Sequence, residues 1–104
     1  MKRGEVWWAN LPAPIGRRPV VLLSRNAAYA VRAAVTVAPV TRSLRGIPVE
    51  VPLGPNDGLP TECVVNLDGI LTIPVKSLER NLTTLPLEKM HRIDQAIKFA
   101  LALS

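Results

Sequence analysis

The chain has 104 residues, of which 48% are hydrophobic, and a net charge of +5. This length predicts one domain over residues 1–104, and the hydrophobic content excludes a disordered chain. A single cysteine, Cys63, excludes an internal disulfide and a cysteine-cluster metal site, and we expect it in the core. We also expect a cytoplasmic protein, because Gly4 and Glu5 stand where a signal peptide needs an apolar stretch, and no apolar run is long enough to span a membrane.

The basic charge is concentrated in one part of the chain. Between Glu5 and Glu50 there is no Asp, Glu or Lys, and the six charged residues there are Arg17, Arg18, Arg25, Arg32, Arg42 and Arg45. A solvated basic surface is the simplest explanation. However, the planar guanidinium also matches phosphate and stacks on bases, which lysine does not. The acid-free span therefore favours a nucleic acid as the partner.

Three strands are predicted in the first half of the chain. Residues 5–11 contain two tryptophans and a valine and predict the first strand, followed by a loop rich in proline. Residues 19–24 predict a second strand, whose run VVLL indicates burial on both faces. Residues 26–32 are ambiguous between a helical turn and an irregular crossing, and residues 34–41 predict a third strand.

The second half predicts three shorter strands, at residues 47–53, 61–67 and 70–73. The two prolines within residues 47–53 are typical of an edge strand or of bulges. Polar or glycine-containing segments at 42–46, 54–60 and 68–69 predict the turns and loops between the strands.

A helix is predicted at the C-terminus, over residues 86–103. Its apolar residues recur at helical spacing, with Pro86 at the start and Thr84 as the candidate cap; they are Leu87, Met90, Ile93, Ile97 and Leu101. The lone histidine, His91, lies off this apolar stripe and is expected on the surface. The chain as a whole predicts a mainly β (α+β) fold, a small bent β-barrel or sheet with one helix packed on it.

Polar side chains at the strand ends are the candidates for chemistry. Arg18 begins the second strand, and the later strand ends carry Thr41, Arg42, Ser43, Asn66 and Asp68. If neighbouring strands bring these ends together, arginine and threonine could bind the nonbridging oxygens of a phosphate, and a carboxylate or an unusual arginine could move the proton. Such a site suits phosphoryl transfer without a metal, and we expect no metal and no cofactor. Taken alone, Thr41 and Asp68 are ordinary turn residues.

The order of these segments resembles the MazF/PemK family of toxin endoribonucleases. The resemblance covers nearly the whole chain, through RGEVWWANL at 3–11, RRPVVLLSRN at 17–26, VTVAPVTRS at 35–43 and ECVVNLDGILTIP at 62–74. It implies an SH3-like small β-barrel of the CcdB/PemK type with a C-terminal α-helix, acting as a homodimer. It also implies metal-independent cleavage of single-stranded RNA, in which the 2′-OH attacks the adjacent phosphate and leaves a 2′,3′-cyclic phosphate and a 5′-OH end. The implied partner is a cognate antitoxin with an acidic, flexible segment.

The resemblance also implies roles for individual residues. Arg18 matches the family's catalytic arginine, Thr41 its catalytic threonine or serine, and Asp68 an acid that part of the family uses in acid–base work or base recognition. The residues expected to bind RNA are Arg17, Arg25, Arg42, Ser43, Arg45 and Asn66. The loop NLPAPIGR at 10–17 is shorter than the family's usual loop and lacks the histidine or glutamate of some relatives, which implies an unusual choice of RNA sequence.

Two alternative functions remain open at this point. A CcdB-like protein would poison DNA gyrase by binding through its C-terminal residues, without catalysis, and Arg18 would be dispensable. A plain nucleic-acid-binding module would bind through its arginines and cleave nothing. Cleavage of RNA without a metal, lost when Arg18 is replaced, separates an endoribonuclease from both.

Overall fold

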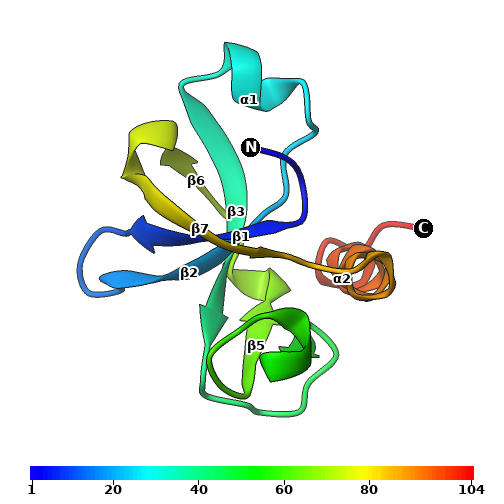
Figure 1. Ribbon diagram of the computed structural model, residues 1–104. Coiled ribbons are helices and arrows are strands. Elements are labelled where there is room, and N and C mark those ends of the chain that lie inside the picture. Colours follow the sequence, from blue (N-terminus) through cyan, green and yellow to red (C-terminus); the bar gives the residue numbers. More distant parts are fainter.

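One antiparallel sheet with a C-terminal helix makes up the protein (Figure 1). The computed structural model describes residues 1–104. The seven strands are β1 (Glu5–Asn10), β2 (Arg17–Leu22), β3 (Ala34–Thr41), β4 (Glu50–Leu53), β5 (Cys63–Asn66), β6 (Leu71–Pro74) and β7 (Leu78–Thr84). The α-helices are α1 (Ala28–Val31) and α2 (Leu87–Ala100), and the short 3-10 helices are η1 (Pro55–Asp57), η2 (Leu67–Gly69) and η3 (Val75–Ser77). Neither α-helix has both the length and the apolar composition needed to cross a membrane.

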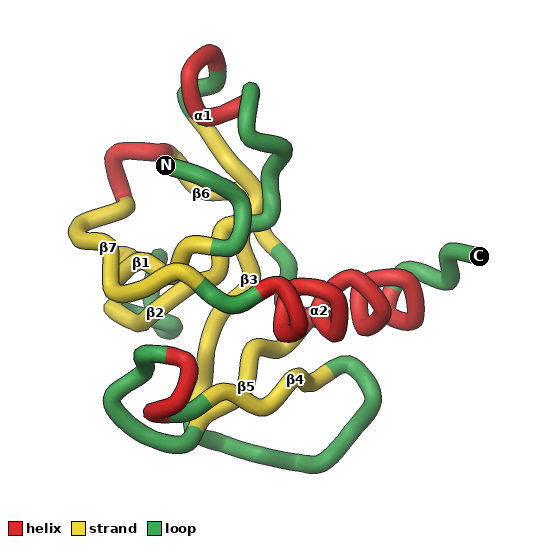
Figure 2. The backbone as a smooth tube through the Cα atoms, turned by 45° about the vertical axis from the view of Figure 1, so that its right-hand side comes forward, coloured by secondary structure: helices red, strands yellow, loops and turns green.

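Strand β3 is the centre of the sheet. The strand order is β4-β5-β3-β2-β1-β7, and β6 also pairs with β3. The first half of β3 pairs with β6 and its last two residues, Val40 and Thr41, pair with β5, so the sheet divides into two parts along this strand (Figures 1 and 2). The predicted fold class, a barrel-like sheet with a C-terminal helix, is confirmed, although β4 and β7 do not pair to close the barrel.

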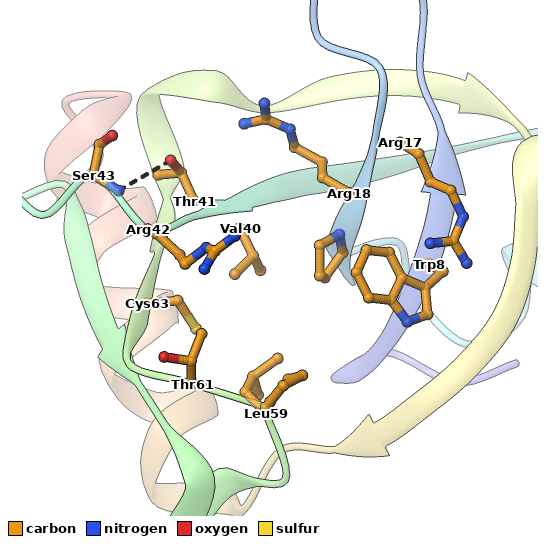
Figure 3. A pocket seen from close by; sticks show the side chains of 12 residues that line it. Trp8, Arg17, Arg18, Val40, Thr41, Arg42, Ser43, Leu59, Thr61 and Cys63 are labelled. Carbon is orange, nitrogen blue, oxygen red and sulfur yellow. Dashed lines mark hydrogen bonds between the residues drawn. The ribbon is translucent and has the colours of Figure 1, made fainter.

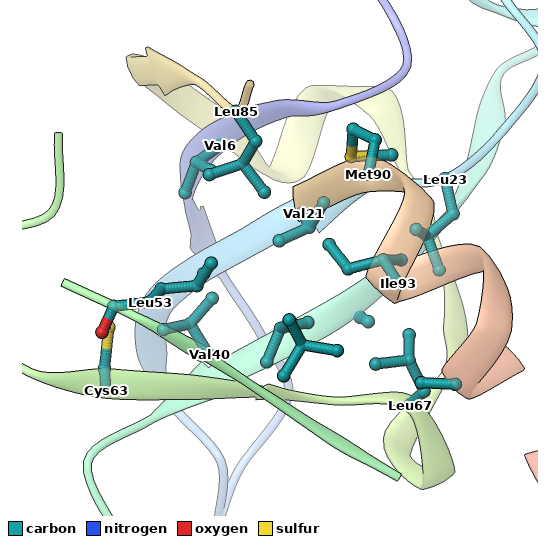
Figure 4. Close-up of a cluster of buried hydrophobic side chains, with 14 of the residues drawn as sticks. Val6, Val21, Leu23, Val40, Leu53, Cys63, Leu67, Leu85, Met90 and Ile93 are labelled. Carbon is teal, nitrogen blue, oxygen red and sulfur yellow. The ribbon is translucent and has the colours of Figure 1, made fainter. Parts of the chain in front are cut away.

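Strand β2 lies between two hydrophobic clusters. Val21 and Leu23 belong to a cluster of 15 buried residues that includes the inner face of α2 (Figure 4). Val20 and Leu22 belong to a second cluster of 8 buried residues on the other face of the strand. The predicted burial of β2 on both faces is therefore confirmed. Because the strand is packed on both sides, the residues that precede Val20 start from a fixed backbone.

The C-terminal helix is shorter than predicted, because it begins at Leu87 and ends at Ala100. Met90, Ile93 and Ala96 are buried against the larger cluster. Leu87 is 88% exposed and Leu101, which lies beyond the last helical residue, is 57% exposed. The predicted apolar stripe is therefore wrong at both ends.

Strand β7 is the one strand that the sequence did not predict. It pairs only with β1 at the edge of the sheet, and Leu78 is its only buried residue, so it has no apolar alternation to recognise. Thr84 is its last residue, and Pro86 is the N-cap of α2, so the predicted Thr84 cap is wrong. The other predicted strands are present with ends shifted by up to three residues, and the edge position of β4 is confirmed.

Candidate active site

A groove of about 580 Å³ opens where β2 begins and β3 ends (Figure 3). Twelve residues line it, and none of them is an aspartate or a glutamate. The polar lining consists of three arginines and three hydroxyl side chains, which are Arg17, Arg18, Arg42, Thr41, Ser43 and Thr61. Its apolar lining includes Val40, Leu59 and Cys63, which also belong to the larger hydrophobic cluster. The groove thus places positive charge over a packed, rigid floor.

The groove forms because β2 and β3 stop pairing at this end. The last pair of their ladder is Val20 with Pro39, and Pro19 and Pro39 have no N–H to donate. Beyond this point, Val40 and Thr41 of β3 pair only with β5. Two residues further along the same register, Arg18 and Thr41 come opposite each other, one on each side of the opening. The predicted meeting of these two strand ends is confirmed.

Arg18 is a positive charge without a counter-ion. Its Nη2 donates a hydrogen bond to the carbonyl oxygen of Ile15 at 3.2 Å, and no carboxylate lies within ion-pair distance. Its Nε is buried and has no acceptor in the protein. A buried donor without an acceptor costs about 1–3 kcal/mol, and an anion in the groove can supply the missing acceptor. Trp8 Nε1, also from a groove residue, is a second such donor.

Arg17, the neighbour of Arg18 in sequence, has different contacts. Its Nε donates to Glu79 Oε1 at 2.7 Å, and its guanidinium lies over the Trp8 ring, 4.3 Å from the ring centre. The Arg17 side chain is 50% exposed. The charge of Arg17 is therefore partly balanced by a carboxylate, whereas the charge of Arg18 is not.

Thr41 and Ser43 lie together on the opposite wall of the groove. The backbone N–H of Ser43 donates to Thr41 Oγ1 at 3.2 Å (Figure 3). Because this bond uses the hydroxyl oxygen as an acceptor, the hydroxyl hydrogen of Thr41 remains available to a ligand. Arg42 lies between these two residues in sequence and forms no ion pair.

The loop after Thr41 is held by a buried carboxylate. Glu50, whose side chain is 3% exposed, accepts hydrogen bonds from the backbone N–H groups of Arg45 at 2.9 Å and Gly46 at 3.0 Å. These donors, that of Arg45 first, hold the pKa of Glu50 below its usual value. Arg45 Nε also lies 3.5 Å from the same carboxylate. Glu50 thereby fixes the loop that carries Arg42 and Ser43 into the groove.

Four of the predicted site residues lie outside the groove. Arg25 follows β2 at the end opposite Arg17 and is exposed, and Arg45 pairs with Glu50. Asn66 and Asp68 lie at the far end of β5, because that strand runs antiparallel to β3 and places Val64 opposite Thr41.

The expectation that Asn66 and Asp68 meet the other strand ends is therefore wrong. Asn66 Oδ1 accepts a hydrogen bond from the backbone N–H of Asp68 at 2.9 Å, which closes the η2 turn. Asp68 itself is exposed. Their roles toward RNA, like those of Arg25 and Arg45, stay predictions.

Sequence reasoning missed two parts of the groove. Trp8 comes from β1, and Leu59 and Thr61 come from the loop between η1 and β5. The available signal for Trp8 was its two-residue spacing from Val6, which predicts that both side chains lie on one face of the strand. Cys63 is buried, as expected, and burial raises the pKa of its thiol. His91 is exposed on α2, which confirms the expectation of a surface histidine.

Comparison with known proteins identifies the family. A family model described as "PemK-like, MazF-like toxin of type II toxin-antitoxin system" matches residues 2–101. "Probable endoribonuclease MazF5" of Mycobacterium tuberculosis is 43% identical over 103 residues, which cover 98% of this chain and 94% of the relative.

Solved structures agree with this assignment. "Mycobacterium tuberculosis toxin MazF-mt6" has a TM-score of 0.89 at 34% identity, covering 96% of this chain and 98% of that chain. "Endoribonuclease in complex with its cognate antitoxin from Mycobacterial species" has a TM-score of 0.90 at 33% identity, covering 100% and 97%. The chain that builds this acid-free groove belongs to the PemK/MazF family of toxins of type II toxin–antitoxin systems.

Proposed function

We propose that this protein is a metal-independent endoribonuclease toxin that cleaves single-stranded RNA in the groove between β2 and β3. The observation that carries the proposal is the groove's lining, three arginines and three hydroxyls without a carboxylate. Such a lining attracts the RNA backbone, because each phosphate carries a negative charge. Relatives named as endoribonucleases support RNA as the substrate.

The proposed reaction is attack of a ribose 2′-OH on the adjacent phosphorus. The bond to the 5′-oxygen of the next nucleotide breaks, which leaves a 2′,3′-cyclic phosphate and a 5′-OH end. Negative charge on the nonbridging oxygens grows in the transition state. Arg18 faces these oxygens with its free donors, and the Thr41 hydroxyl donates from the other wall, so both residues stabilise the transition state more than the substrate. Arg42 and Ser43 bind the backbone beside them, and Asp68 is outside the groove and acts only on RNA that extends past it.

The proposed inhibitor is a cognate antitoxin with an acidic, flexible C-terminal segment. Its carboxylates would pair with Arg18 and Arg42, which have no counter-ion within this chain. RNA and antitoxin would then compete for the same groove. A solved relative whose title names its cognate antitoxin supports this partner. We further propose that the toxin is a homodimer that acts in the cytoplasm.

The test is cleavage of a broad pool of single-stranded RNA in EDTA, with the ends of the products mapped. Wild-type protein should give 2′,3′-cyclic phosphate and 5′-OH ends, and Arg18→Ala should form them at least about 10³-fold more slowly. Arg32→Ala is the matched control, because Arg32 is an exposed arginine outside the groove. Increasing salt should weaken substrate binding steeply. RNA left intact by the wild-type protein would overturn the proposal in favour of a gyrase poison or a plain binding module.

A further inference from the structure

Arg17 contacts two other side chains at the edge of the groove, the ring of Trp8 and the carboxylate of Glu79. Trp8 lies opposite Pro19 in the β1–β2 ladder, which makes Arg17 its diagonal neighbour on the same face of the sheet. The Arg17 guanidinium covers the Trp8 ring at 4.3 Å, and Glu79 binds Arg17 Nε at 2.7 Å. Trp8 and Arg17 line the groove, whereas Glu79 does not. The carboxylate thus holds Arg17 without adding a negative charge to the lining of the groove.

An irregularity in strand pairing puts Glu79 in this position. Trp8 pairs with Arg80 of β7, and the next residue, Ala9, pairs with Leu78, so Glu79 is the one residue of β7 left without a partner there. Such a β-bulge turns a side chain away from the direction that regular pairing would give it, and bulges are frequent beside active sites. The bulge therefore brings a carboxylate from β7 to the guanidinium of β2, across β1.

The chemistry of the stack differs from that of the other groove arginines. Arg18 and Arg42 have no counter-ion and present charge, whereas Arg17 is paired with Glu79 and presents a half-exposed planar group over an indole. Unstacked RNA bases bind to aromatic rings and to the flat faces of arginine side chains. A neutralised, planar stack at the edge of a phosphate-binding groove suits a base better than a phosphate.

We propose that Trp8 and Arg17 form a stacking platform for the nucleobase next to the scissile phosphate, and that Glu79 is a positioning residue for Arg17. The proposal rests on the proposed function for the identity of the substrate as single-stranded RNA. It makes the expected RNA-binding role of Arg17 specific to a base. RNA then enters with its phosphate between Arg18 and Thr41 and one neighbouring base on Arg17.

Replacement of Arg17 by lysine tests the platform through cleavage kinetics. Lysine keeps the charge and can pair with Glu79, but it has no planar face. Arg17→Lys and Arg17→Ala should both raise KM by roughly tenfold, the scale of one lost base stack, with kcat within about twofold. Glu79→Gln should raise KM in the same way, since Arg17 is no longer held. A phosphate contact would behave differently, because Arg17→Lys would then match wild type and Arg17→Ala would lower the salt dependence of KM. That pattern would overturn the platform.

Tryptophan fluorescence tests the platform without cleavage. The protein has two tryptophans, and Trp7 bonds to Glu5 and packs against the smaller cluster rather than lining the groove. In Trp7→Phe, which leaves Trp8 as the only emitter, a pool of 2′-O-methyl RNA heptamers should quench the emission and an abasic heptamer should not. The matched variant Trp8→Phe, which leaves only Trp7, should show little change with either probe.

The outcomes separate the platform from the proposed function. Quenching by the base-containing probe in a protein that cleaves no RNA would refute the endoribonuclease function and support a base-binding surface. Normal cleavage, with equal quenching by the abasic probe or none by either, would refute the platform and leave the endoribonuclease function standing.

Discussion

Replacement of Arg18 separates the effect of its charge from the effect of its shape. Arg18→Lys keeps a positive charge at the end of β2 but removes the planar set of donors, and Arg18→Ala removes both. The wild-type side chain is held by one hydrogen bond, from Nη2 to the Ile15 carbonyl at 3.2 Å, and its buried Nε has no acceptor. At least one donor is therefore free for a phosphate oxygen.

The size of the effect follows from these contacts. Loss of one donor aimed at the charge of a transition state lowers kcat by about 10²–10³-fold. The kcat of Arg18→Lys should be about 10²-fold lower than that of wild type. The kcat of Arg18→Ala, which also loses the charge, should be at least about 10³-fold lower. Stability should change little. The lost hydrogen bond to Ile15 lies at an exposed site, and removal of the unsatisfied Nε opposes its cost, so the free energy of unfolding should shift by less than about 1 kcal/mol.

Single-turnover cleavage of an RNA with one cleavage site measures the chemical step, and urea unfolding measures stability on the same preparations. If Arg18→Lys cleaves at the wild-type rate, charge alone is sufficient and the argument from the free donors is wrong. If Arg18→Ala stays within tenfold of wild type while its stability is unchanged, Arg18 does not act on the reacting phosphate at all.

The remaining predictions concern the opposite wall and its support. Thr41→Ala should reduce kcat by about 10²-fold with the fold intact, since one transition-state hydrogen bond is lost. Unchanged kcat would remove Thr41 from the site. Because the pKa of Glu50 is lower in the folded than in the unfolded protein, its carboxylate stabilises the fold above the ordinary pKa of 4.5 and loses this effect as pH falls through the folded value. In urea unfolding, Glu50→Gln should therefore have a lower free energy of unfolding than wild type at pH 7. This difference between the two proteins should become smaller as the pH is lowered. Gly58→Ala should destabilise by about 2 kcal/mol or more, since φ is +89° and a Cβ would clash with Thr83, while Gly46→Ala, with open space at φ +67°, should cost about 1 kcal/mol.

The strands that could be predicted are those whose side chains are buried in a regular pattern. The continuous run VVLL gave β2, because a strand with clusters on both faces needs apolar residues at every position. The ends of β2 and β3, and hence Arg18 and Thr41, followed from where these runs stop. Arg18 and Thr41 meet because β2 and β3 are antiparallel neighbours. The apolar runs of β2 and β3 therefore also locate these two site residues.

The parts that could not be predicted depend on pairing between segments far apart in sequence. Nothing in LERNLTT at 78–84 distinguishes an exposed edge strand from a loop, so the bulge at Glu79 had no signal. The same limit explains Asp68. Its position after a strand end was correct, but only the antiparallel direction of β5 relative to β3 shows that this end lies away from Thr41.

The contrast between Arg17 and Arg18 follows from the alternation of a strand. Adjacent residues of a strand point to opposite faces, and at this strand end the two faces differ in what they offer. Arg17 shares its face with Trp8 and meets Glu79 across β1. Arg18 stands opposite Ala9, which offers neither a carboxylate nor a ring. A one-residue shift in the register of β2 would exchange these two environments. Pro19 and the buried residues after it impose the observed register. This register therefore decides which arginine faces the phosphate with an unbalanced charge.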